Sequence, residues 1–450
     1  MDGHLLIQNA TLILPDRVVE GDLRVSDGSI ATIAPGGGLD AGSNEAVIDA
    51  TGLHLLPGAI DPHVHFREPG STEKEDLESG SRAAAAGGVT AFLDMPNNDP
   101  NATNRATLER KIAIASKKSV THHGFFIGAT NDNITDLQSV EGMEGVCGIK
   151  IFMGSSTGDL LVDQQKQLEN IFANTGGIIA THAEDEERLQ QRSAKFEHRT
   201  DIASHAECRD VECAFLATKR AASLAKDHDH RLHIVHLTSQ KEADWLQKNK
   251  GDLITTEVCT QHLTFDQDDV ESLGERVLMN PPIRYTEDRD SLWRRLKDGT
   301  IDCVVTDHAP HTLKSKSVGF PDAPAGMPGV ETSLPLMLTH ALDGKCSVSE
   351  VVSWMCEGPA KVYGIQNKGS LIEGYDADLT LVDLETKRTI TDADTWTRVG
   401  WTPYNGMELT GWPRYTIVDG EIVHKREENG PLCGLPVALP GSVGRALRFG

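Results

Sequence analysis

The chain has 450 residues, of which 38% are hydrophobic, and 43 Lys and Arg against 67 Asp and Glu give a formal charge of −24. This acidic balance argues against nucleic acid and anionic membrane surfaces as partners, because both would repel it. No apolar run approaches the roughly 20 residues that a membrane span needs, so we expect a small-molecule ligand, and an anionic one would require a local cationic pocket.

The two ends of the chain are predicted to be rich in β-strands. Strand-like runs with turns occupy residues 1–54 and return in residues 371–426. We expect the two ends to form one small β-sandwich-like domain. Residues 427–450 have few periodic apolar positions, which predicts a poorly ordered tail. The clearest runs are 5–10, 21–25, 29–33, 378–382 and 415–423.

Residues 55–370 alternate compact apolar runs with amphipathic stretches. This alternation is typical of repeated βα units around a parallel sheet, and eight such units predict a (β/α)8 barrel of the TIM type, hence an α/β fold. The active site of such a barrel lies at the carboxyl ends of its strands. The predicted strands are 55–65, 89–96, 122–128, 146–153, 177–182, 231–237, 253–259 and 302–307.

Histidines and an aspartate stand where these strands are predicted to end. His63 and His65 share one face of the first strand, because side chains alternate with a period of two. His182, His236 and Asp307 each follow an apolar run of their own. A strand or core histidine would explain any one of them, but their convergence at one barrel mouth predicts a metal site for Zn²⁺ or a similar ion.

Lys150 interrupts the apolar strand 146–153, where a bare ammonium would be costly to bury. If CO₂ carbamylates it, its head becomes a carboxylate-like anion that can bridge two cations. The alternative is a lysine that reaches the barrel rim with its charged end in water.

The stretches DPHVHFREPG at 61–70, MPNN at 95–98, MNPPIR at 279–284 and TDHAPH at 306–311 together resemble dihydroorotases of the amidohydrolase superfamily. The similarity extends from about residue 3 to residue 426. It implies a (β/α)8 barrel, a small β-domain from both chain ends, two Zn²⁺ ions per subunit, and the interconversion of N-carbamoyl-L-aspartate and L-dihydroorotate in pyrimidine biosynthesis.

The same resemblance assigns roles to residues. It implies His63, His65 and Asp307 on one zinc, His182 and His236 on the other, and Lys150, N6-carboxylated, as the bridge. Many relatives carry aspartate at that last position, and this chain resembles the lysine type. The substrate carboxylate would be bound by Arg67, Asn97 and His311, the ring by the backbone at Asn280, Ala325 and Gly326, and His65 would also contact the substrate.

The mechanism expected is attack by a hydroxide that bridges two metal ions, which lower the pKa of the water from which it forms. Asp307 would accept the proton as the catalytic base and deliver it to the departing ring nitrogen. Residues 312–325 have Gly and Pro but no clear period, so they are predicted to form a mobile loop over the site.

Two alternatives stay open. Another cyclic amidohydrolase would act on allantoin, a hydantoin or dihydrouracil, but those rings lack the carboxylate that Arg67 and His311 would bind. A non-catalytic amidohydrolase-like scaffold would be expected to lack metal ligands, and here each expected ligand is present.

The compartment and assembly are less constrained. The first residues lack the basic and apolar segments of a secretory signal, and the 8 cysteines show no CxxC spacing, so we expect a cytoplasmic protein with reduced thiols. Whether the chain forms a homo-oligomer is not determined by its sequence.

Overall fold

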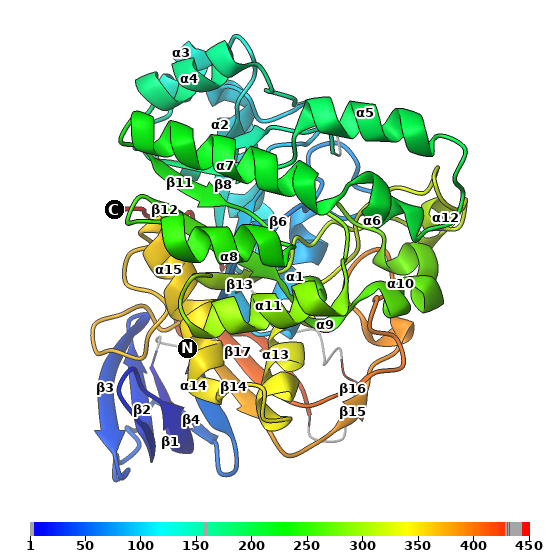
Figure 1. Cartoon of the computed structure of the whole chain (residues 1–450). Helices are drawn as coiled ribbons and strands as arrows, with labels where there is room; N and C mark the ends of the chain where they lie inside the picture. Colours follow the sequence, from blue (N-terminus) through cyan, green and yellow to red (C-terminus); the bar gives the residue numbers. More distant parts are fainter. Residues whose placement is uncertain (1–3, 157–159, 428–429, 431, 433–442) are drawn as a thin grey trace.

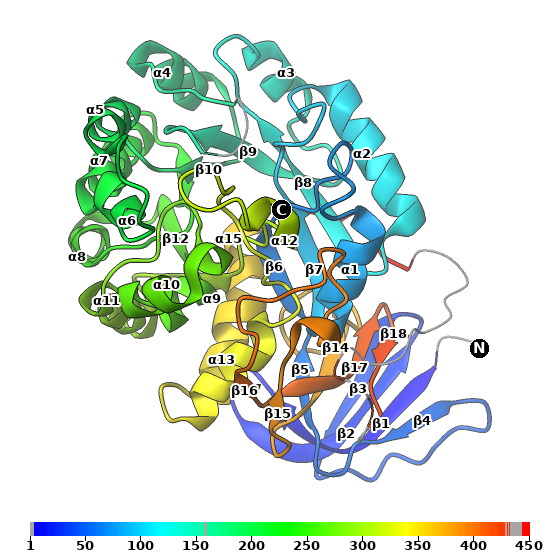
Figure 2. The same ribbon diagram turned by 90° about the vertical axis from the view of Figure 1, so that its right-hand side faces the viewer.

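The computed structural model describes residues 4–156, 160–427, 430, 432 and 443–450. Within them lie two eight-stranded sheets and one two-stranded sheet, the latter formed by β15 (Arg388–Thr389) and β16 (Glu408–Leu409). Helices surround the strands of one large sheet, and the other large sheet lies to one side (Figures 1 and 2). Among the described residues, no helix is both long and apolar enough to cross a lipid bilayer.

The central sheet is the predicted barrel. Its strands run in the order of the chain, and every neighbouring pair is parallel. The first and last strands meet where the His65 amide donates to the His308 carbonyl at 2.7 Å and Thr306 donates to buried Asp61. The strands are β6 (Ala59–Val64), β7 (Val89–Asp94), β8 (His122–Gly128), β9 (Val146–Phe152), β10 (Ile178–His182), β11 (Arg231–Ile234), β12 (Ile254–Cys259) and β13 (Cys303–Val305).

Helices with one apolar face cover the outside of the barrel (Figure 2). In α7, Ala214, Ala217, Ala221 and Ala225 are buried on one face, and such small side chains let the helix lie close to the strands. The other helices are α1 (Leu77–Ala86), α2 (Arg105–Lys118), α3 (Ile134–Ser139), α4 (Gln165–Asn174), α5 (Glu186–Phe196), α6 (Ser204–Cys208), α8 (Gln240–Asn249), α9 (Thr260–Thr264), α10 (Gln267–Leu273), α11 (Thr286–Lys297), α12 (Leu313–Lys316), α13 (Ser333–Leu342), α14 (Val348–Val352) and α15 (Gly358–Tyr363), with α7 spanning Val211–Asp227.

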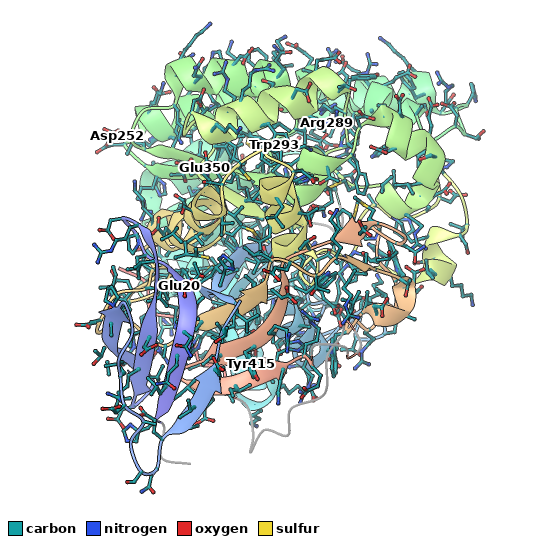
Figure 3. The ribbon with its side chains drawn as sticks, turned by 90° about the horizontal axis from the view of Figure 1, so that it is seen from below. Glu20, Asp252, Arg289, Trp293, Glu350 and Tyr415 are labelled. Carbon is teal, nitrogen blue, oxygen red and sulfur yellow. The ribbon has the colours of Figure 1, made fainter. Side chains whose placement is uncertain are left out.

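The second large sheet joins both ends of the chain, as expected. Its two halves meet where β5 pairs antiparallel with β14, with Leu55 opposite Leu381. Figure 3 labels Glu20 and Tyr415, one in each half. The strands are β1 (Leu5–Ile13), β2 (Val18–Ser26), β3 (Ser29–Pro35), β4 (Ala46–Asp49), β5 (His54–Pro57), β14 (Leu379–Asp383), β17 (Trp412–Val418) and β18 (Glu421–Lys425).

The predicted first barrel strand, 55–65, is wrong as a single strand. It divides at Gly58, so that β5 belongs to the small sheet and β6 opens the barrel. A Cβ added at Gly58 would lie 2.1 Å from Thr90 Oγ1, and the Gly58 amide donates to the Asp378 carbonyl at 2.8 Å. The chain changes sheets here because only glycine allows so close an approach.

The chain end was predicted to be poorly ordered, but residues 443–450 are packed against the barrel. Leu447 is fully buried, and its amide donates to the His123 carbonyl at 2.9 Å. Arg445 pairs with Asp376 and Asp419. The side chains of Leu447 and Arg445 therefore fix this segment through tertiary contacts. The other residues of the predicted tail at 428–429, 431 and 433–442 lie outside the described residues.

Candidate metal centre and active site

One cavity at the carboxyl ends of the barrel strands collects nearly all of the predicted site residues. Only His311 is absent from its lining, and His311 contacts Arg67, which is part of it. A larger cavity of about 490 Å³ at the opposite end of the barrel contains none of them. The lining comprises His63, His65, Arg67, Asn97, Lys150, Phe152, Ser156, His182, His236, Asn280, Asp307, Ala309, Ala325 and Gly326.

His63, His65 and Asp307 form the first cluster in this cavity. His65 Nδ1 donates to Asn97 Oδ1 at 2.7 Å, which leaves its Nε2 lone pair facing Asp307 Oδ1 at 3.0 Å. His63 Nε2 lies 3.3 Å from the same oxygen. All three residues offer ligand atoms within 4.8 Å of one another, so together they could hold a metal ion.

His182 and His236 form the second cluster. His182 Nε2 donates to Glu184 Oε2 at 2.9 Å, so its Nδ1 lone pair faces His236 Nε2 at 2.9 Å. The other ring nitrogen of His236, Nδ1, is buried and has no hydrogen-bond partner among the described residues. The His63 and His236 ring centroids are 5.4 Å apart, so the two clusters adjoin.

The protonation of these rings suits metal binding. Burial lowers the pKa of His65 to about 4, and it also lowers the pKa of His182 and of His236. Burial raises the pKa of Asp307, but its interactions with His63 and His65 outweigh the burial, and the pKa is lowered. Neutral imidazoles and an ionised carboxylate are the forms that ligate metals.

Lys150 projects from β9 into the same cavity and is 1% exposed. Its Nζ has no hydrogen-bond partner among the described residues and lies 5.2 Å from the centre of the Phe152 ring. The alternative of a charged end in water is therefore wrong. Burial lowers the pKa of Lys150 to about 8, which favours the neutral amine that reacts with CO₂.

Arg67 supplies the local positive charge. It is 5% exposed, its Nε has no hydrogen-bond partner within the described residues, and its NH2 group donates to His311 Nε2 at 3.4 Å. Burial and the nearby Arg67 charge lower the pKa of His311 to about 2, so His311 is a neutral acceptor. The guanidinium thus faces the cavity with donor capacity left for an anion.

Asn280, Ala325 and Gly326 line the same cavity. His205 Nε2 lies 3.0 Å from both Asn280 Oδ1 and the Met279 carbonyl, which fixes the amide. Gly326 has φ +130°, and a Cβ there would lie 2.5 Å from the Ala309 carbonyl. Only glycine therefore allows this backbone to lie so close to the Ala309 carbonyl at the edge of the cavity.

Three residues of the site have the left-handed backbone that side chains other than glycine rarely adopt. The φ angles are 61° at Arg67, 40° at His236 and 47° at Asp307. Such conformations cost of order 1–3 kcal/mol each and persist where surrounding contacts impose them. Here they follow the ends of barrel strands and turn the side chains into the cavity.

Sequence reasoning missed two buried carboxylates that hold these ligands. Glu257 on β12 accepts from His63 Nδ1 at 2.5 Å, and Glu184 accepts from His182 and pairs with Arg209. Both are fully buried. Glu257 is a charged residue inside a predicted strand, as Lys150 is. The sequence therefore held the same indication of a functional side chain at both positions.

The loop at 312–325 is anchored at its centre. Lys316 in α12 is 2% exposed, and its Nζ donates to the carbonyls of Leu278, Pro324 and Gly326 at 3.2, 2.9 and 2.9 Å. Phe320 packs edge-on against His205, with ring centroids 5.8 Å apart. The end of the loop, at Ala325, lines the cavity, and one buried lysine ties the loop to the residues beside Asn280.

The family model of the amidohydrolases matches residues 54–423 of the chain. The chain belongs to the amidohydrolase family. Among curated relatives, a dihydroorotase of Methanosarcina acetivorans is 34% identical over 448 residues, which cover 97% of this chain and 95% of the relative. A dihydroorotase of Bacillus subtilis is 33% identical over 414 residues, covering 90% and 94%.

Solved structures of other cyclic amidohydrolases share the fold of this amidohydrolase. An L-hydantoinase from Arthrobacter aurescens superposes with a TM-score of 0.91 at 28% identity, covering 99% of each chain. A dihydropyrimidinase from Brevibacillus agri gives 0.88 at 26% identity, with the same coverage. This amidohydrolase is therefore a hydrolase of cyclic amides on a TIM-like barrel, and its family and ligand clusters are those of a metal-using enzyme.

Proposed function

We propose that this amidohydrolase is a dihydroorotase, which interconverts N-carbamoyl-L-aspartate and L-dihydroorotate in pyrimidine biosynthesis. The curated relatives support the proposal because they are dihydroorotases aligned over most of the chain. The solved structures with similar folds are hydantoinases and dihydropyrimidinases, so the fold does not select the substrate. The selection rests on the side chains that line the cavity.

Arg67 carries the proposal. A buried guanidinium with an unpartnered Nε faces the cavity, and none of the ion pairs formed among the described residues involves it. An arginine held this way matches a carboxylate, which it can bind through two parallel hydrogen bonds. Dihydroorotate carries a ring carboxylate, whereas hydantoin, dihydrouracil and allantoin do not. Asn97 lines the same cavity, His311 contacts Arg67, and both would complete the carboxylate site.

The donor set fits two divalent cations, and we propose zinc. His63, His65 and Asp307 would hold one ion, His182 and His236 the other, and Lys150, carboxylated on Nζ, would bridge them. The ligand atoms gathered in each cluster and the unpartnered Lys150 Nζ support this assignment. When bound, such ions polarise the scissile carbonyl and lower the pKa of water.

The residues of the chain would orient the substrate and move the proton. Arg67 fixes the ring carboxylate, and the backbone at Asn280 and at Ala325 and Gly326 orients the ring amide. Asp307 accepts a proton from the attacking water and passes it to the ring nitrogen as the amide bond breaks. In the reverse direction the same carboxylate takes the nitrogen's proton as the ring closes.

The first test is a substrate comparison. The purified chain is incubated with L-dihydroorotate, dihydrouracil and allantoin, and loss of the ring absorbance is followed before chelation, after chelation and after return of zinc. Selective and zinc-restorable turnover of dihydroorotate is the expected result. Turnover of the uncharged rings alone would overturn the role of Arg67, and full metal occupancy without turnover would favour a scaffold.

The proposed compartment is the cytoplasm. The seven cysteines among the described residues are free thiols, as a reducing compartment maintains them. Subcellular fractionation checks this expectation.

A further inference from the structure

A single buried carboxylate touches both halves of the ligand set. Glu257 Oε1 accepts from His63 Nδ1 at 2.5 Å and from the backbone amide of His236 at 3.2 Å. Glu257 Oε2 accepts from His233 Nε2 at 3.0 Å, and the side chain is fully buried. Strand β6, strand β11 and the turn that follows β11 therefore all contact one side chain from β12.

The contact with His63 selects its tautomer. A carboxylate next to Nδ1 requires the proton on that nitrogen, so Nε2 keeps its lone pair. Nε2 is the atom that lies 3.3 Å from Asp307 Oδ1 in the first cluster. The opposite tautomer would place a proton where the ligand atom must be.

The contact with His236 fixes its backbone. His236 has φ 40°, a conformation that costs free energy unless its surroundings impose it. Its amide donates to Glu257 Oε1, and the next amide, that of Leu237, donates to the Glu257 carbonyl at 2.9 Å. This turn directs the imidazole toward His182 in the second cluster.

We propose that Glu257 is a positioning residue that prepares both halves of the metal centre, the first through the tautomer of His63 and the second through the backbone of His236. The inference rests on the metal centre of the proposed function but not on its substrate. His233, held at Nδ1 by Thr255 at 2.8 Å, keeps the carboxylate in place from the far side.

The test measures zinc affinity of the full chain by chelator competition for Glu257→Gln. Glutamine keeps the size of the side chain but removes its charge and one acceptor oxygen. Loss of a carboxylate behind a ligating histidine reduces metal affinity about 10- to 100-fold, and we expect this loss for both equivalents. The matched control is Asp378→Asn, which removes another buried carboxylate bonded to a histidine, His122, at 3.1 Å and at the opposite end of the barrel.

The control should lose thermal stability and keep the zinc affinity of the unaltered chain. An unchanged affinity in Glu257→Gln, or a loss confined to one equivalent, overturns the proposal. An unaltered chain that binds no zinc would instead refute the metal centre itself. If Glu257→Gln does not fold, nitrogen NMR of histidine-labelled unaltered holoprotein decides the matter: a proton on His63 Nδ1 is expected, and its absence overturns the assigned tautomer.

Discussion

His65 Nε2 lies 3.0 Å from Asp307 Oδ1, although the two residues are 242 positions apart in the chain. They meet at the seam where the first and last barrel strands close, next to the bridge between Val64 and His308. The closure of the barrel therefore places the proposed proton carrier beside the proposed ligands.

Asp307→Asn tests that role. Asparagine keeps the shape but cannot accept a proton, so kcat should fall about 10²- to 10⁴-fold, and zinc bound at the His63 and His65 cluster should decrease. Steady-state kinetics and zinc content per chain measure both effects. Asp302→Asn, at the other end of the same strand segment and paired with Lys250, is the control and should retain full kcat. An active Asp307→Asn enzyme would disprove the assignment.

Arg67→Ala should weaken substrate capture rather than metal binding. A charge-assisted hydrogen bond contributes roughly 1.5–3 kcal/mol, which corresponds to about a tenfold to hundredfold loss of kcat/KM on dihydroorotate. Any activity on dihydrouracil should not fall, because that ring has no carboxylate. Equal losses on both substrates would show that Arg67 serves the fold or the metal instead.

Lys150 should make recovery of activity depend on bicarbonate. Its buried, unpartnered amine can add CO₂, and the resulting carbamate would bridge the ions. Metal-free chain reloaded with zinc should regain more activity in bicarbonate than in CO₂-free buffer, as measured by initial rates. Lys150→Gln should show no such difference. Equal recovery of the unaltered chain in both buffers would argue for an unmodified lysine.

Lys316→Met should loosen the loop over the site. The substitution removes the donor to three carbonyls; Leu278 keeps the Gly326 amide as a donor, but Pro324 and Gly326 lose theirs, and a buried unsatisfied group costs about 1–3 kcal/mol. We expect faster proteolysis within the loop and reduced kcat/KM with unchanged zinc content. Exposed Lys314 in the same helix provides the control, and Lys314→Met should behave like the unaltered chain. A parallel loss of zinc would make the loop part of the metal centre.

Glu331 should make stability depend on pH. Burial raises its pKa from the ordinary value of 4.5 to about 8, while its Oε2 accepts from the Trp396 amide at 2.8 Å. A raised folded-state pKa gives stability that is complete below about pH 4.5 and is lost as pH rises toward about 8. Glu331→Gln removes this titration. Its free energy of unfolding, measured in urea, should therefore exceed that of the unaltered chain by about 1–3 kcal/mol between about pH 5 and about pH 8.5. If the free energies of unfolding of the variant and of the unaltered chain changed with pH in parallel, the raised pKa of Glu331 would be contradicted.

The sequence was sufficient for the barrel and for the residues that line its mouth. Each barrel strand is a compact apolar run, and parallel strands place their carboxyl ends together, so His182, His236 and Asp307 could be assigned to one site from position alone. Side chains alternate between the two faces of a strand, so His63 and His65 could also be predicted to point to the same side. The structure brings these residues into one cavity.

Only the tertiary structure decided which groups support them. Glu257 holds His63 from 194 positions away, His205 holds Asn280, and Lys316 anchors the loop near Gly326. The same holds for the division of residues 55–65 at Gly58 and for the packed segment 443–450. Apolar periodicity reports which face of an element is buried, but a hydrogen bond between distant side chains depends on strand register and on the path of each loop, and those are set only when the elements pack together.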